Sequence, residues 1–117
     1  MKKQFRIHKN EEFQKILKQR RFTKAPSMVI YYQPKQERYA RVGITVSKKI
    51  GKAVIRNKIK RQIRMMCQEV LNFEEAYDMI IMVRSKYLEF TFEENKETLQ
   101  KLVNKLNNEF NTGDINV

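Results

Sequence analysis

The longest helical pattern of apolar residues runs through residues 53–71. Its apolar positions recur every three or four residues and fall on one narrow stripe of a helix: Ile55, Ile59, Ile63, Met66 and Val70. Polar and basic residues occupy the remaining positions. The pattern predicts an amphipathic helix with one buried face.

Two further segments predict helices near the ends of the chain. Residues 10–20 begin at Asn10, a favourable N-cap residue, and place Phe13, Ile16 and Leu17 on one face. A last helix begins near Thr91, which has capping-box spacing to a glutamate three residues later. Its apolar face is formed by Leu99, Leu102, Val103, Leu106 and Phe110. We expect residues 111–117 to be a frayed tail.

Three segments predict strands. Residues 27–33 are rich in β-branched and aromatic residues. Residues 41–47 alternate between an apolar side and a polar side that carries Arg41, Gly43 and Thr45. Residues 77–84 contain five consecutive apolar residues, which is typical of an interior strand covered on both faces. The order helix, strand, strand, helix, strand, helix predicts one α+β domain over residues 1–117.

Positive charge is concentrated in the first half of the chain. Residues 1–64 contain 20 basic and 3 acidic residues, whereas residues 65–117 contain 5 basic and 10 acidic residues. Such an uneven distribution favours a polyanionic partner, and nucleic acid is a better candidate than an acidic protein or a membrane surface. The apolar stripes are needed for the core, which argues against a membrane-surface helix.

Several function classes find no support in the residues. Cys67 is the only cysteine, so neither an internal disulfide nor a zinc cluster is expected, and a reducing cytoplasmic location is favoured. No apolar run approaches the length of a membrane span, and no apolar segment follows the basic start as in a signal peptide. His8 is the only histidine and is interpreted as solvated rather than as a general base. We therefore expect no catalytic residues, no bound metal and no small-molecule ligand.

Residues 47–64 hold eight basic residues and no acidic one. The predicted RNA-binding residues are Lys48, Lys49 and Lys52 before the main helix, and Arg56, Asn57, Lys60, Arg61 and Arg64 along it. Their spacing of three or four residues builds a face that spans several phosphates, and arginine can grip a phosphate with two hydrogen bonds. Asn57 is uncharged and can recognise a base edge or a 2′-hydroxyl. The alternative is a solvated basic face, but such faces usually carry glutamates.

The same segment resembles a known signature. The chain has the lead-in Arg41-x-Gly43-x-x-Val46-Ser47, followed by Lys48-Lys49-x-Gly51-x-Ala53-Val54-x-Arg56-Asn57-x-x-Lys60-Arg61-x-x-Arg64. This pattern closely resembles the signature of the bacterial ribonuclease P protein subunit. The resemblance covers nearly the whole chain.

The resemblance implies a fold and a set of partners. The family fold is an α+β sandwich of four strands and three helices in the order α-β-β-β-α-β-α, with an unusual left-handed crossover through the basic helix. The partner is a catalytic RNA that uses Mg²⁺, and the substrate is precursor tRNA, whose 5′ leader is removed. The protein itself binds no cofactor.

The resemblance also implies a leader-binding cleft between the sheet and the basic helix. By position, Phe13, Leu17, Tyr31 and Arg41 map to that cleft, where aromatic rings stack on bases and the guanidinium holds the backbone. The residues alone leave Phe13 equally divided between core and cleft. Three positions depart from the family pattern: Leu17 replaces a second aromatic residue, Arg20 replaces a glycine, and Lys58 replaces an arginine.

Two other function classes remain. A non-enzymatic RNA binder, such as a ribosomal protein or RNA chaperone, has the same charge and fold, and only the extended motif argues against it. A self-sufficient nuclease needs clustered carboxylates or a histidine pair. The basic half offers only Glu11, Glu12 and Glu37 for that role.

Overall fold

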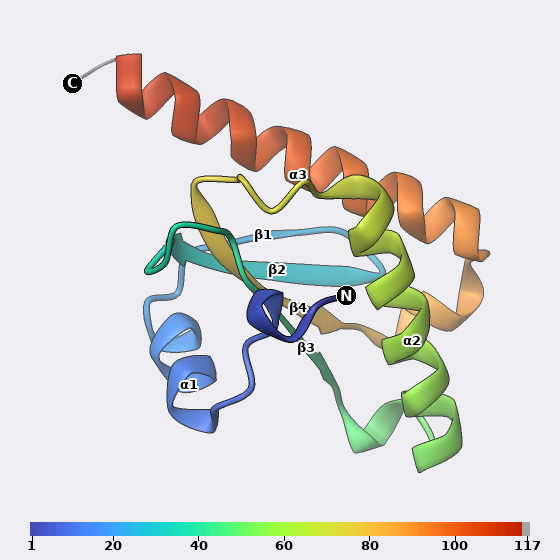
Figure 1. Ribbon diagram of the computed structural model, residues 1–117. Coiled ribbons are helices and arrows are strands. Elements are labelled where there is room, and N and C mark those ends of the chain that lie inside the picture. The colour runs from blue at the N-terminus through green and yellow to red at the C-terminus, as the bar shows by residue number, and fades with distance from the viewer. Residues whose placement is uncertain (116–117) are drawn as a thin grey trace.

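Four strands form one mixed sheet in the order β1-β2-β4-β3, and three α-helices pack against it (Figure 1). The computed structural model describes the backbone of residues 1–115 and the side chains of residues 1–110. The strands are β1 Phe22–Lys24, β2 Met28–Pro34, β3 Val42–Val46 and β4 Tyr77–Val83. The α-helices are α1 Asn10–Lys18, α2 Ala53–Val70 and α3 Phe92–Ile115, and the 3-10 helices are η1 Lys3–Phe5, η2 Lys48–Ile50 and η3 Ser85–Glu89. The predicted α+β fold is confirmed.

The strand pairing makes α2 a crossover. β1 and β4 both pair antiparallel with β2, whereas β3 pairs parallel with β4. Since β3 and β4 are parallel neighbours, the chain between them must return along the sheet, and α2 provides that connection. The left-handedness of this crossover stays a prediction from the family resemblance.

β4 is an interior strand of the sheet and is buried along most of its length, as its apolar run predicts. Met79, Ile81 and Val83 belong to the main core beneath α2 and α3. Ile80 points to the opposite face and packs with Ile16 of α1 in a second cluster. Figure 1 shows α1 and α3 on opposite sides of the sheet.

The apolar stripe of α2 has the predicted phase. Ile59, Ile63 and Met66 are buried in the main core, while Ile55, near the start of the helix, is exposed. Cys67 is fully buried beside Met66. Burial, and secondarily the charge of Glu75, raises the pKa of the Cys67 thiol to about 12, so it remains an unreactive core thiol near neutral pH.

α3 begins with the predicted capping box. The Glu94 backbone N–H donates to Thr91 Oγ1 at 3.1 Å, and the Thr91 N–H donates to Glu94 Oε1 at 2.9 Å. The helix continues to Ile115 and thus takes in residues 111–115 of the predicted tail, while residues 116–117 lie outside the described residues. No helix in the described part of the chain is long and apolar enough to cross a membrane.

Two details of the first 30 residues differ from the sequence expectations. Asn10 is the first residue of α1 rather than its cap; Lys9 holds the cap position and makes no side-chain capping bond. Residues 21–26, between the first predicted helix and the first predicted strand, contain β1, in which Phe22 pairs with Tyr31 of β2. This short edge strand completes the four-stranded sheet that the resemblance implied.

The departure at Arg20 has a structural consequence. Arg20 follows α1 with a φ of 53°, in the left-handed region. Glycine adopts that conformation without a steric penalty, which explains why glycine suits this position. Arginine is strained in this conformation, but the chain still turns after α1 and enters β1 at Phe22.

Candidate nucleic-acid interface

The predicted RNA-binding residues form one continuous basic surface along η2 and α2. Lys48 and Lys49 lie in η2, Lys52 caps α2, and Arg56, Asn57, Lys60, Arg61 and Arg64 lie off its buried stripe. Lys48, Lys49, Lys52, Asn57 and Arg61 are exposed, and Arg56, Lys60 and Arg64 are half-buried. None of the seven basic side chains forms an ion pair within the part of the chain that the structure describes. Their charges are therefore available to an external anion.

The four residues predicted for the leader cleft lie together on the α1 face of the sheet. Phe13 and Leu17 of α1 and Tyr31 of β2 are half-buried around Ile16 and Ile80. Tyr32, the next residue of β2, points to the opposite face and joins the main core. The four residues therefore lie between α1 and the sheet and not beside the basic helix, because the apolar stripe of α2 packs on the other face. A leader-binding cleft at these residues stays a prediction.

Arg41, one of the four residues predicted for the leader cleft, forms two ion pairs within the protein. Its guanidinium lies 2.6 Å from Glu12 Oε2 and 3.3 Å from Asp78 Oδ2, and its side chain is only 12% exposed. Its backbone N–H also donates to Asp78 Oδ1 at 2.9 Å. Burial alone would lower the pKa of Arg41, but the hydrogen bond to Glu12 and the charges of Asp78 and Glu12 outweigh it and raise the pKa. Arg41 thus fixes α1 to the sheet rather than presenting a free cation.

Gly43 allows Phe13 to pack directly on β3. A Cβ atom at Gly43 would lie 2.7 Å from Phe13 Cζ, closer than real contacts allow. Gly43 pairs with Ile80 in the sheet, so the ring of Phe13 lies over the backbone of β3 beside the second core cluster. Glycine suits this position of the predicted polar strand face because the ring of Phe13 occupies the space that a side chain would fill.

Replacing Gly43 with alanine is expected to destabilise the protein by about 1–3 kcal/mol, because the added methyl group overpacks the contact with Phe13. Urea unfolding of the variant measures this loss. The same replacement in a Phe13→Ala background should cost much less, since the clashing ring is gone. Equal losses in the two backgrounds would show that Phe13 is not the neighbour that limits this site.

Half of the α1 face is left uncovered by α1 and carries an aromatic that the sequence analysis missed. Phe22 of β1 is 47% exposed, and its ring centroid lies 5.5 Å from that of Tyr31. Val29, Thr45 and Met82 continue this face in register across the sheet and are only half-buried. Phe22 shares one face of β1 with Lys24 while Thr23 is buried on the other, but a strand of three residues is too short to identify by this pattern.

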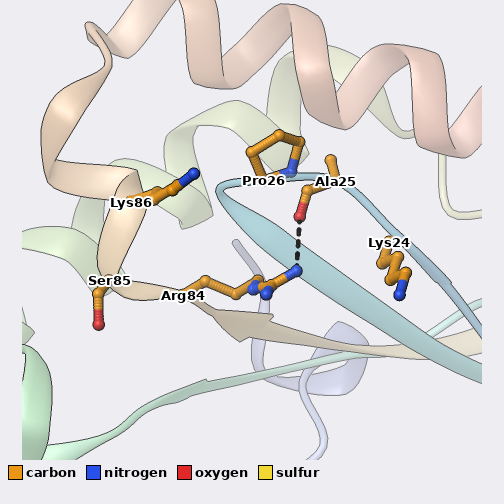
Figure 2. Close-up of a pocket in the computed structure, with 6 residues that line it drawn as sticks. All are labelled: Lys24, Ala25, Pro26, Arg84, Ser85 and Lys86. Atoms are coloured by element: carbon orange, nitrogen blue, oxygen red, sulfur yellow. Dashed lines mark hydrogen bonds between the residues drawn. The ribbon is translucent and has the colours of Figure 1, made fainter.

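Three more basic residues lie at the end of the α1 face of the sheet, beside the β1–β2 turn. Lys24, Arg84 and Lys86 line an open hollow of about 510 Å³ between the β1–β2 turn and the start of η3 (Figure 2). Arg84 Nη1 donates to the Ala25 carbonyl oxygen at 3.3 Å, which links the two turns. Sequence reasoning missed Arg84 and Lys86 because they lie in the acidic half of the chain.

The chain is similar to known proteins in sequence and in fold. The family model described as Ribonuclease P matches residues 1–107. The ribonuclease P protein component of Mesoplasma florum is 45% identical over 105 residues, covering 88% of this chain and 96% of that protein. The one from Bacillus velezensis is 46% identical over 107 residues, covering 90% and 91%. The solved RNase P protein of Staphylococcus aureus superposes with a TM-score of 0.75 at 33% identity, covering 86% and 93%. That of Thermotoga maritima gives 0.74 at 25% identity, covering 86% and 96%.

Proposed function

Because the chain belongs to the ribonuclease P protein family, we propose that it binds the catalytic RNA of a bacterial ribonuclease P together with precursor tRNA. In this proposal the complex removes the 5′ leader of the precursor in the cytoplasm, and the RNA performs the hydrolysis with Mg²⁺. The observation that carries the proposal is the unpaired basic surface of η2 and α2.

The chemistry is assigned to the RNA because the protein's own side chains do not form a hydrolytic centre. Among the described residues, no three histidine, cysteine, aspartate or glutamate side chains gather as a metal site requires. Cys67 is buried with a raised pKa, so it does not serve as a nucleophile, and His8, the only histidine, cannot form a histidine pair. The protein's contribution is therefore binding and positioning.

Support for binding to the catalytic RNA comes from the rigidity and charge of α2. The helix is fixed to the core by Ile59 and Ile63, so its basic side chains project from a rigid element. Arginine and lysine on such a surface pair with successive phosphates of a folded RNA.

Support for leader binding comes from the uncovered half of the α1 face. Tyr31 and Phe22 offer neighbouring rings on which unpaired bases can stack. Lys24, Arg84 and Lys86 at the end of this face supply positive charge for the backbone of the same strand. Stacking and phosphate contacts recognise a single strand with little sequence preference.

The test of the proposed function is reconstitution. Precursor tRNA is incubated with the protein alone, with the catalytic RNA alone, and with both, at low Mg²⁺. We expect accurate cleavage at the mature 5′ end to be fastest with both and absent with the protein alone. Cleavage by the protein alone would support a nuclease, and binding without stimulation of cleavage would support a non-enzymatic RNA binder.

Replacing Tyr31 with alanine is expected to weaken the holoenzyme's affinity for precursor tRNA by about 1–3 kcal/mol, the scale of one base–aromatic stack. Affinity for mature tRNA, which lacks the leader, should barely change. Equilibrium binding of both RNAs to wild-type and variant holoenzyme measures the difference. Equal losses for both ligands would remove Tyr31 from the leader site.

Replacing Arg61 with alanine is expected to weaken affinity for the catalytic RNA by about 1–3 kcal/mol, because an exposed, unpaired guanidinium loses its phosphate contact. The fold should be retained. Ile59→Ala should have the opposite profile and lower the free energy of unfolding by about 2–5 kcal/mol, since Ile59 is buried. A strongly lowered melting temperature for Arg61→Ala, with an unchanged one for Ile59→Ala, would contradict the assignment of Arg61 to the surface and Ile59 to the core.

A further inference from the structure

The N-terminal segment brings basic side chains to the outer edge of β3. The Ile7 N–H donates to the Val42 carbonyl oxygen at 2.9 Å, and Arg6 forms a parallel bridge with Val42. The Ile7 side chain enters the second core cluster with Ile16 and Ile80. Because neighbours in an extended segment point to opposite sides, Arg6 and His8 are directed away from that cluster and toward α2.

On the α2 side, two residues of the basic surface line the same hollow as Arg6 and His8. Lys60 and Arg64 lie one helical turn apart, and together with Arg6 and His8 they line one hollow of about 110 Å³. Its other lining residues are Met1, Ile7, Val42 and Ile44, so within the described part of the chain no carboxylate lines the hollow.

The hydrogen bonding of Arg6 leaves part of its guanidinium without a partner. Its Nη2 donates to the Met1 carbonyl oxygen at 3.0 Å, which holds the side chain in place. Its Nε is buried and has no hydrogen-bond partner among the described residues. A buried donor without a partner is costly, and gathered positive charges repel one another. One anion in the hollow would offset both the missing hydrogen-bond partner of Arg6 and the repulsion among the positive charges.

We propose that Arg6 and His8 complete a phosphate-binding site with Lys60 and Arg64, between the N-terminal segment, β3 and α2. The hollow is smaller than the ~300–1,000 Å³ typical of sites for drug-sized ligands, which suits a single phosphate group rather than a base. This inference rests on the proposed function to the extent that the phosphate belongs to the catalytic RNA. The N-terminal segment thereby extends the RNA-binding surface beyond η2 and α2.

The sole histidine of the chain gives a direct test of the site. Inorganic phosphate is titrated into the free protein at constant pH, with sodium chloride at matched ionic strength as the comparison, while the imidazole resonances of His8 are followed by NMR. We expect a saturable shift with phosphate and none with chloride. Arg6→Gln should weaken this phosphate binding about tenfold or more, the scale of a charge-assisted hydrogen bond. Lys3→Gln removes an exposed charge outside the hollow and should leave it unchanged.

A second measurement separates RNA phosphate from free phosphate. Affinity for the catalytic RNA should fall about tenfold in Arg6→Gln and stay near wild type in Lys3→Gln, and inorganic phosphate should compete less with the RNA in Arg6→Gln than in wild type. A His8 signal that does not respond to phosphate, or equal RNA affinities for both variants, would overturn the site. Wild-type RNA binding and stimulated cleavage would in that case still support the proposed function.

Discussion

Replacing Asp78 with alanine is expected to lower the free energy of unfolding by about 3–5 kcal/mol, the range for a buried ion pair broken from one side. The Asp78 side chain is fully buried, and it accepts hydrogen bonds from both the backbone N–H and the guanidinium of Arg41. Its loss leaves Arg41, which is only 12% exposed, with Glu12 as its one remaining carboxylate. Chemical denaturation followed by circular dichroism measures the change.

Two matched variants identify the cause of that loss. Asp78→Asn keeps an oxygen that can accept from the Arg41 backbone N–H and should cost less than the alanine variant. Glu12→Gln removes the partner that is 33% exposed, and a solvent-screened charge of this kind contributes at most about 1 kcal/mol. If Glu12→Gln were as costly as Asp78→Ala, the stabilisation would come from fixing α1 rather than from the buried charge.

Raising the salt concentration from about 50 to about 200 mM is expected to weaken the affinity for the catalytic RNA by roughly 10²–10⁴-fold. The basic surface of η2 and α2 offers about 5–8 phosphate contacts, each of which releases counterions from the RNA when it forms. The measurement is the slope of log affinity against log salt. A slope near zero would show that binding does not depend on phosphate neutralisation.

Single variants calibrate that slope. Arg61→Ala should reduce its magnitude by about one unit, since one phosphate contact is removed. Lys101→Ala removes an equally exposed charge from α3, outside the basic surface, and should leave the slope unchanged. Equal effects of the two variants would indicate that only the net charge of the protein matters.

The elements that could be predicted from the sequence are those whose periodicity reflects their own burial. Ile59, Ile63 and Met66 form the buried stripe of α2, and four of the five consecutive apolar residues of β4 are buried. Thr91 caps α3 because the capping box depends only on residues three positions apart. In each case a local pattern carries the structural information.

The features that could not be predicted depend on partners far along the chain. β1 is three residues long and exists because Phe22 and its neighbours pair with β2. Arg41 resembles a free cation on a polar strand face until the sheet places Asp78 beside it. Arg6 and His8 reach α2 because the N-terminal segment pairs with Val42. Each of these contacts joins segments that are far apart in the sequence, so it depends on how distant strands are paired.

The central position of β4 also determines when the chain can fold during its synthesis. β2 and β3 are made first, but they do not pair with each other, because β4 lies between them. At the ~5–20 residues per second of translation, about 2–7 s pass between completion of β3 and completion of β4. During that interval β1 and β2 can pair with each other, but β3, which leads into the basic segment, has no neighbouring strand to pair with. A fragment that ends before Tyr77 therefore contains the RNA-binding motif and lacks the strand on which its fold is assembled.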